Sequence, residues 1–251
     1  MNDILNSEQI HSFEQNGFLV VKGFVAKDVA QRCLEDVSAF CDSGRRTHAG
    51  LNPAHVVEEA SGGVKYCESV DHYVPSIKRL LNLKLLAAAS VLLGGQDTYF
   101  FAAEMHDKVP RQGTITPPHQ DNFYFCLDPA DALTIYVPLE LHGRANGGLC
   151  YVRGSHHLGT MDHRKSKVKA FSSELLGLAP GEQQVYPLEM QAGDVVFHHA
   201  NTVHFAPRNP SDLHRRSLSI RVNGVNAKVS MTMRERYMVN RTFNRDEKVQ
   251  S

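Results

Sequence analysis

The sequence predicts a mainly β fold with helices packed on one face of it, an α+β class. Helix-like periodicity is concentrated in residues 8–93, whereas residues 98–222 form short β-rich segments separated by Gly, Pro and Asn. Several short strands with such turns are typical of an all-β barrel or sandwich. The 251 residues suit one large domain, since single barrels and sandwiches often reach this size. We therefore expect one domain over 1–251, with a core at 7–222 and a tail at 223–251.

The helices are predicted from caps and apolar spacing. Ser7 is a suitable N-cap for a helix over 8–16, which Gly17 ends, and a strand follows at 18–21. Apolar residues spaced by three and four predict an amphipathic helix over 26–40. Residues 42–72 show no sustained period, so we expect a loop that covers a site. Pro75 opens a helix that runs to residue 93, before Gly94 and Gly95.

The strands that follow are rich in β-branched and aromatic residues. The tail after residue 231 is charged, with a short helix expected over 231–239. Helices that precede the strands in the sequence are expected to pack together on one face of the β core. The expected strands cover residues 98–106, 122–127, 132–139, 148–152, 184–188, 194–199 and 217–222.

The composition excludes several classes of partner. The 27 basic residues balance the 27 acidic ones, so no net charge favours nucleic acid or an anionic membrane. The chain has no apolar run of 18 residues and no basic-then-apolar N-terminal signal. Its five cysteines are odd in number and include no Cys-x-x-Cys pair. We expect free thiols, a cytoplasmic location and a small-molecule substrate.

A metal site is predicted around the run from Pro117 to Tyr124. Its centre is His119-Gln120-Asp121. In an extended segment, residues two apart point to the same side, so the imidazole and the carboxylate would project together. Two histidines and one carboxylate form the facial triad of non-haem Fe(II) oxygenases, which leaves open positions on the metal. One further histidine is needed.

Three histidines compete for that position. His198 and His199 end a predicted strand, and His204 follows shortly after it. Periodicity alone does not choose among them.

The motifs together resemble the phytanoyl-CoA dioxygenase family of Fe(II)- and 2-oxoglutarate-dependent oxygenases. The resemblance rests on His119-Gln120-Asp121, on Arg153-Gly154-Ser155-His156, and on Asp194, His204 and Arg215 in that order. An opening pattern around Phe13, Gly17 and Phe18 extends it over roughly residues 7 to 222. The resemblance implies a double-stranded β-helix, a cupin-like jelly-roll barrel, with N-terminal helices.

The resemblance also implies roles for individual residues. It makes His204 the distal metal ligand and Arg215 the partner of the far carboxylate of 2-oxoglutarate, which a guanidinium can hold with two hydrogen bonds. Ser217 lies two residues further on the same strand face. Thr134 and Tyr136 share one face of their strand and are further candidates for co-substrate contacts.

The implied reaction consumes O₂ and 2-oxoglutarate, releases succinate and CO₂, and hydroxylates a C–H bond. The carboxylate at Asp121 favours hydroxylation, because halogenating relatives need a small residue there. Arg221 continues the inward face of Arg215, so we expect it to bind an anionic group of the substrate. Phe123 is expected to form an apolar wall beside the ligands.

The sequence departs from the family pattern in two places. Phe205-Ala206-Pro207 replaces the frequent Gly-Ser-Gly after the distal histidine, so a serine contact with 2-oxoglutarate is missing. Arg153 replaces the usual proline before Gly154. Neither change touches a metal ligand.

Two other functions remain open. A cupin-type metal dioxygenase that does not use 2-oxoglutarate would have no need of Arg215. A non-catalytic barrel that serves as a binding module would have no need of the three metal ligands.

Overall fold

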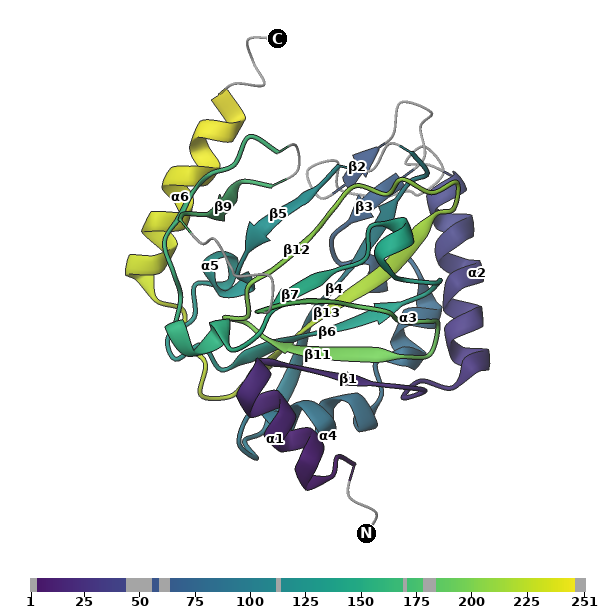
Figure 1. Ribbon diagram of the computed structural model, residues 1–251, viewed down its shortest axis with the longest axis horizontal. Coiled ribbons are helices and arrows are strands. Elements are labelled where there is room, and N and C mark those ends of the chain that lie inside the picture. The colour runs from purple at the N-terminus through teal and green to yellow at the C-terminus, as the bar shows by residue number, and fades with distance from the viewer. Residues whose placement is uncertain are drawn as a thin grey trace.

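The computed structural model describes residues 4–43, 56–58, 64–111, 114–168, 171–177 and 184–246. Two antiparallel sheets lie against each other (Figure 1). The larger sheet contains, in order, β1 (Phe18–Val21), β11 (Val195–His199), β6 (Ala132–Pro138), β13 (Arg215–Gly224), β4 (Thr98–Lys108), β3 (Val64–Cys67) and β2 (Val56–Glu58). The smaller sheet contains β10 (Val185–Pro187), β7 (Cys150–Val152), β12 (His204–Ala206) and β5 (Thr116–His119). A separate hairpin pairs β8 (His163–Lys165) with β9 (Ser173–Leu175).

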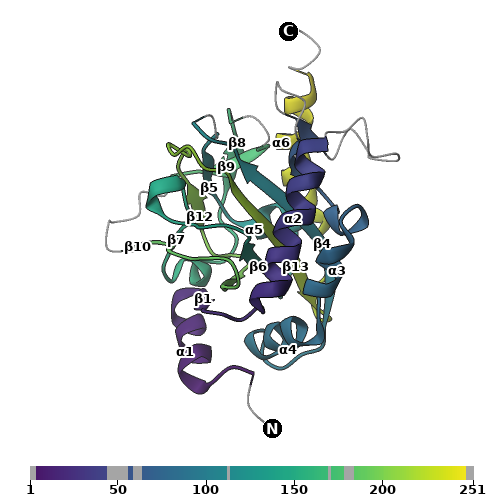
Figure 2. The same cartoon turned by 90° about the vertical axis from the view of Figure 1, so that its right-hand side faces the viewer.

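The predicted mainly β class and jelly-roll architecture are confirmed, with one difference. The strands form two open sheets and not a closed barrel. Figure 2 shows the layers, with the smaller sheet on one side of the larger sheet and α2 (Lys27–Ser43), α3 (Pro75–Leu80) and α4 (Leu83–Leu92) on the other. The remaining helices are α1 (Ser7–Asn16), α5 (Asp121–Phe125) and α6 (Met231–Asp246).

Alternation along the central strands separates a hydrophobic core from a polar interior. On β13, Leu218, Ile220 and Val222 join the cluster that packs against the helices. Successive side chains of a strand point to opposite faces, so Ser217 and Arg221 face the smaller sheet. This polar face of the larger sheet forms one wall of the functional site.

Two predicted elements are wrong. The expected helix over 75–93 is two helices, because Leu81 leaves the helical conformation and the Asn82 side chain caps α4 by accepting from the Leu85 N–H. The expected strand over 122–127 is the short helix α5, which begins directly at Asp121. Hydrogen bonds of Asn122 to both Leu127 and Thr160 stabilise this turn.

The ends of other elements also differ. Asn6, and not Ser7, caps α1, through a capping box with Gln9. Part of the expected loop over 42–72 is the β2–β3 hairpin, which joins the larger sheet, while residues 44–55 and 59–63 lie outside the described residues. The tail forms α6, which is longer than expected and packs against α5 through Tyr237.

Among the described residues, no helix combines the length and the apolar character needed to cross a membrane.

Candidate metal centre and co-substrate pocket

Three side chains offer metal-ligating atoms at one point between the sheets. His119 ends β5, Asp121 begins α5, and His204 begins β12. His119 and His204 are direct partners across the β5–β12 pair, and their ring centroids are 4.2 Å apart. The ligating atoms of the three residues all lie within 4.8 Å of one another. Both Nε2 atoms are 3.6 Å from Oδ1 of Asp121.

Backbone carbonyls orient both imidazoles. The Nδ1 atom of His119 lies 2.8 Å from the carbonyl oxygen of Pro117, and Nδ1 of His204 lies 3.0 Å from that of Thr202. A carbonyl only accepts, so each Nδ1 carries the proton and each Nε2 keeps its lone pair. This arrangement is typical of metal-bound histidines, whose second nitrogen is held by a hydrogen bond.

The other oxygen of Asp121 is fully engaged with the protein. Thr134 Oγ1 donates to Oδ2 at 2.5 Å, and His198 Nε2 donates to it at 2.9 Å. Thr134 and His198 are direct partners between β6 and β11, so two neighbouring strands hold the same oxygen. The Tyr151 hydroxyl lies 2.8 Å from Nδ1 of His198 and fixes that ring in turn. Only Oδ1 is left for a metal ion.

Electrostatics keep His204 and Asp121 in the protonation states that a cation needs. Burial lowers the pKa of His204 well below its usual range, and His119 adds to the effect. Burial acts to raise the pKa of Asp121, but the surrounding histidines outweigh it and hold this pKa well below its usual range. The neutral imidazole of His204 and the ionised carboxylate of Asp121 are the forms that bind metal.

The segment between the first two ligand residues is fixed by the buried side chain of Gln120. Its amide nitrogen donates to the carbonyls of Gly159 at 2.8 Å and Asn201 at 2.7 Å. Its amide oxygen accepts from the Met161 N–H at 2.7 Å. As expected, the side chains of His119 and Asp121 project together, because Gln120 between them is extended, with φ −118° and ψ 134°. The strand ends there, and Asp121 is the first residue of the helix α5.

A second group of polar residues surrounds Arg215 at the start of β13. Arg215 Nη1 donates to Nε2 of His142 at 3.0 Å and to the Tyr136 hydroxyl at 3.4 Å. The Tyr136 hydroxyl also contacts Nε2 of His142. Burial lowers the pKa of His142 well below its usual range, and the charge of Arg215 reinforces this, so the imidazole is neutral.

Two buried donors on β13 have no acceptor among the described residues. They are Nε of Arg215 and Oγ of Ser217. A buried polar group without a partner is costly, so these atoms fit a carboxylate ligand that would satisfy both. The donor set near the triad therefore fits 2-oxoglutarate.

Arg221 lies between two aromatic rings on the same face of β13. Its guanidinium carbon is 4.0 Å from the ring centroid of Phe101 and 3.9 Å from that of Phe125. Its direct partner on β6 is Thr134, which holds Asp121, so Arg221 lies beside the triad. Burial lowers its pKa to about 10, and the guanidinium keeps its charge at neutral pH.

Phe123 does not share a strand face with the ligands. Its ring stacks on His163 at 4.2 Å and meets Tyr237 of α6 edge-on. Tyr124 is the residue whose ring meets His119 edge-on, at 5.7 Å. Because α5 is a helix and not a strand, Tyr124 takes the place beside His119 that the strand pattern predicted for Phe123.

Sequence reasoning missed several residues of the site. The sequence favours a structural or supporting role for His198 over a ligand role, but its spacing gives no sign that it holds Asp121. Tyr151 and His142 carry no motif, since only the fold places them near the triad, and Gln120 is the unspecified middle position of the His-x-Asp motif. Clusters of this kind depend on strand register, which the sequence does not specify closely enough.

The fold and the donor set together define a non-haem iron dioxygenase: a jelly roll that holds two histidines and one carboxylate between its sheets. A family model described as phytanoyl-CoA dioxygenase matches residues 13–217. The chain belongs to the phytanoyl-CoA dioxygenase family.

Individual relatives agree with this assignment. The chain is 30% identical to phytanoyl-CoA dioxygenase 1 of Oryza sativa subsp. japonica, with 87% of this chain and 89% of the relative covered. It is 25% identical to the peroxisomal phytanoyl-CoA dioxygenase of Rattus norvegicus, over 87% of this chain and 68% of the relative. The fold is similar to the crystal structure of EctD from S. alaskensis with 2-oxoglutarate and 5-hydroxyectoine, with a TM-score of 0.72, 19% identity, and 92% and 80% of the two chains covered.

Proposed function

We propose that this protein is an Fe(II)- and 2-oxoglutarate-dependent dioxygenase that hydroxylates an unactivated C–H bond of a small, anionic molecule. The observation that carries the proposal is the meeting of two fixed Nε2 lone pairs and one free carboxylate oxygen within 4.8 Å. His119, Asp121 and His204 would hold the iron. When bound, iron and 2-oxoglutarate would supply the oxidising power, with O₂ consumed and succinate and CO₂ released.

The residues around Arg215 would hold the co-substrate. Its unpartnered Nε and the hydroxyl of Ser217 offer donors to the far carboxylate, and Tyr136 positions the guanidinium. Thr134 acts indirectly, because its hydroxyl is used on Asp121. The buried position of Arg215 strengthens each of these hydrogen bonds, since little water competes for them.

The substrate would lie near Arg221 and the aromatic rings of α5 and α6. Arg221 carries a positive charge on the inner face of β13, and its guanidinium makes no ion pair among the described residues. An anionic group of the substrate would find this charge beside the triad. Phe123 would take part in the wall through its packing against His163 and Tyr237.

Two further proposals concern the domain organisation and the location of the protein. We propose that residues 1–251 act as one domain, in which α6 covers α5. A cytoplasmic location is supported by the five cysteines, all of which are free.

The test is spectroscopic. Fe(II) is added to the protein without oxygen, 2-oxoglutarate follows, and the visible metal-to-ligand charge-transfer band is recorded. We expect the band, and substrate-dependent succinate once O₂ is admitted. Iron binding without the band would favour a cupin-type dioxygenase that does not use 2-oxoglutarate, and no iron binding would favour a binding module.

A further inference from the structure

The C-terminal helix α6 lies beyond the family match but close to the metal centre. The family model ends at residue 217, whereas α6 covers Met231–Asp246. The Ser230 N–H, directly before α6, donates to the Cys126 carbonyl at 2.7 Å. Further along the helix, Nδ2 of Asn240 donates to Oγ of Ser173 on β9 at 3.1 Å. The helix is therefore attached both to the end of α5 and to the β8–β9 hairpin (Figure 1).

One face of α6 is turned toward these elements. Met233, Tyr237 and Asn240 are partly buried, while the residues between them are exposed. Spacings of four and three residues place side chains on one face of a helix. The ring of Tyr237 meets that of Tyr124 edge-on at 5.6 Å and that of Phe123 edge-on at 6.3 Å. The Tyr237 ring is therefore turned toward α5.

Tyr124 connects α6 to a metal ligand. Its ring meets that of His119 edge-on at 5.7 Å, and its hydroxyl donates to the Ser173 carbonyl at 2.6 Å. Ser173 is also the residue to which Asn240 donates. The position of Tyr124 therefore depends on α6 twice, directly through Tyr237 and indirectly through Ser173.

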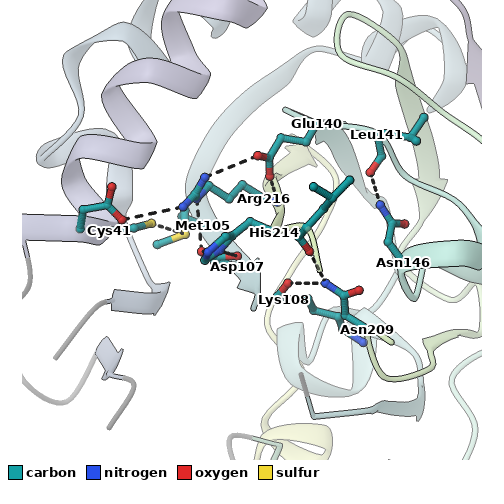
Figure 3. Close-up of polar contacts among 12 residues, drawn as sticks. Cys41, Met105, Asp107, Lys108, Glu140, Leu141, Asn146, Asn209, His214 and Arg216 are labelled. Carbon is teal, nitrogen blue, oxygen red and sulfur yellow. Dashed lines mark hydrogen bonds and ion pairs between the residues drawn. The ribbon is translucent and has the colours of Figure 1, made fainter. Parts of the chain in front are cut away.

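Two arginines on opposite faces of β13 differ in their partners. On the helix-facing side, Arg216 Nε lies 3.2 Å from Asp107 and its Nη1 lies 3.5 Å from Glu140, so its charge is neutralised (Figure 3). On the inner side, Arg221 makes no ion pair among the described residues. The charge of Arg221 is therefore the one that suits an anionic group of the substrate.

The helix α5 brings this substrate region and the Tyr124 ring together. Phe125 packs on the Arg221 guanidinium at 3.9 Å, and the preceding residue, Tyr124, contacts His119. A substrate held at Arg221 beside the triad would therefore meet the aromatic wall that α5 forms. A wall of packed rings cannot accept extra atoms without moving, so its position limits the size of the substrate.

We propose that Tyr237 is a specificity-determining residue of the active site: it holds Tyr124 against His119 and so limits the size of the substrate that the site admits. The inference rests on the proposed function, because it concerns the substrate of the same site. Without the Tyr237 ring, Tyr124 loses its support on the side of α6 and can move away from His119. The metal ligands should keep their places, because their hydrogen bonds come from β5, β6, β11 and the turn before β12.

Proton NMR of the Co(II)-loaded protein tests the position of Tyr124. The Nδ1 protons of His119 and His204 should give two signals shifted by the metal, and Tyr124→Ala, which removes the neighbouring ring, identifies that of His119. We expect Tyr237→Ala to move the His119 signal and to leave the His204 signal in place. Tyr237→Phe keeps the ring and should give the wild-type spectrum.

Substrate size is tested with the Fe(II)-loaded protein. Small carboxylates and phosphate esters are screened for succinate release, and kcat/KM is compared for an accepted acid and for the same acid lengthened by a methylene group. We expect Tyr237→Ala to raise the ratio of the larger to the smaller acid about tenfold, because a methylene group in a filled pocket changes kcat/KM by about that factor or more. Tyr237→Phe should keep the wild-type ratio. The Kd of 2-oxoglutarate, taken from the charge-transfer band, should be unchanged in both variants.

Tyr73→Ala is the matched control. The Tyr73 ring also packs on an aromatic ring, that of Phe40 at 6.1 Å, but on the helix side of the larger sheet. Its loss should leave both NMR signals and the substrate ratio as in the wild type. Thermal unfolding of the loaded proteins confirms that each variant is folded, and Tyr237→Leu takes the place of Tyr237→Ala if the smaller side chain unfolds α6.

The outcomes separate this inference from the proposed function. A His119 signal that stays in place in Tyr237→Ala, or a substrate ratio equal to that of the wild type, would overturn the role of Tyr237 alone. Wild-type protein that binds no metal would overturn both. Wild-type protein that accepts no acid of the screen would overturn the proposed anionic substrate, and the His119 signal would still decide whether Tyr237 positions Tyr124.

Discussion

His198 donates from Nε2 to Oδ2 of Asp121 at 2.9 Å, and the side chain that makes this bond is only 2% exposed. The bond leaves the second carboxylate oxygen, Oδ1, facing the two ligand imidazoles. His198 is therefore a positioning residue, which acts on the metal through Asp121.

Replacing His198 by Phe should weaken metal binding. The phenyl ring fills a similar volume but gives no hydrogen bond, so Asp121 Oδ2 loses one of its two donors. Loss of such an outer partner typically costs 10–100-fold in metal affinity, and we expect a rise of about that size in the Kd for Fe(II), measured by anaerobic titration. His157→Asn, at an exposed position, is the control and should bind as the wild type does. An unchanged Kd in His198→Phe would show that Thr134 alone positions the carboxylate.

Asp121→Asn should abolish iron binding and succinate formation. The amide keeps the size of the carboxylate but supplies no charge, and the two imidazoles then lack an anionic third ligand. The measurement is iron content after dialysis, together with succinate released from 2-oxoglutarate. Asp128→Asn, on an exposed residue of the same segment, should retain both. Retained turnover in Asp121→Asn would contradict the metal assignment.

Arg221→Ala should affect the substrate and spare the co-substrate. Removing the guanidinium from between Phe101 and Phe125 takes away the charge proposed to bind the substrate. In a screen of small carboxylates and phosphate esters coupled to succinate release, KM for an accepted substrate should rise about 10–100-fold, the equivalent of one charge-assisted contact. Succinate formed without substrate should stay at its wild-type rate.

Arg153→Ala is the matched control for that variant. Arg153 also stacks on a ring, that of Tyr186 at 4.7 Å, but it is exposed on the smaller sheet side. It should leave KM unchanged. If substrate-free succinate formation falls in Arg221→Ala as far as the coupled reaction does, Arg221 belongs to the co-substrate pocket.

Gly147→Ala should destabilise the turn that follows the distal ligand. Gly147 has a φ of +71°, and a Cβ there would lie 2.5 Å from the carbonyl oxygen of Arg208. Gly154 has the same φ of +71° in the left-handed region, but an added Cβ would make only ordinary contacts, at 3.6 Å from the Gln15 carbonyl oxygen. Gly154→Ala should therefore cost only the strain of about 1–2 kcal/mol in free energy of unfolding, whereas Gly147→Ala adds a steric cost of about 1–3 kcal/mol. Equal losses in urea unfolding would show that the turn moves away without cost.

The sequence alone determined the class of fold and most of its strands. Alternation along Leu218 to Val222 and the β-rich run at 132–139 are local patterns, and they identify strands whatever they pair with. The sequence likewise contains the motif His119-Gln120-Asp121 and the spacing from His204 to Arg215, which need no knowledge of the fold. Local patterns failed where a side-chain contact decided the backbone. Asn82 ends one helix by capping the next, and Asn122 holds α5 in a helical turn where aromatic residues favoured a strand.

Only the tertiary structure decided which polar residues meet. His198 and Thr134 hold one oxygen of Asp121 because β11 and β6 pair in one register, and a shift by one residue would turn both side chains to the helix side. Lys108 faces Arg215 for the same reason across β4 and β13. The chain separates these partners by 64 and 107 positions, as the residue numbers 134 to 198 and 108 to 215 show. No local pattern spans such distances. The ligand residues could therefore be predicted from the sequence, but the residues that orient them and set the charge around them could not.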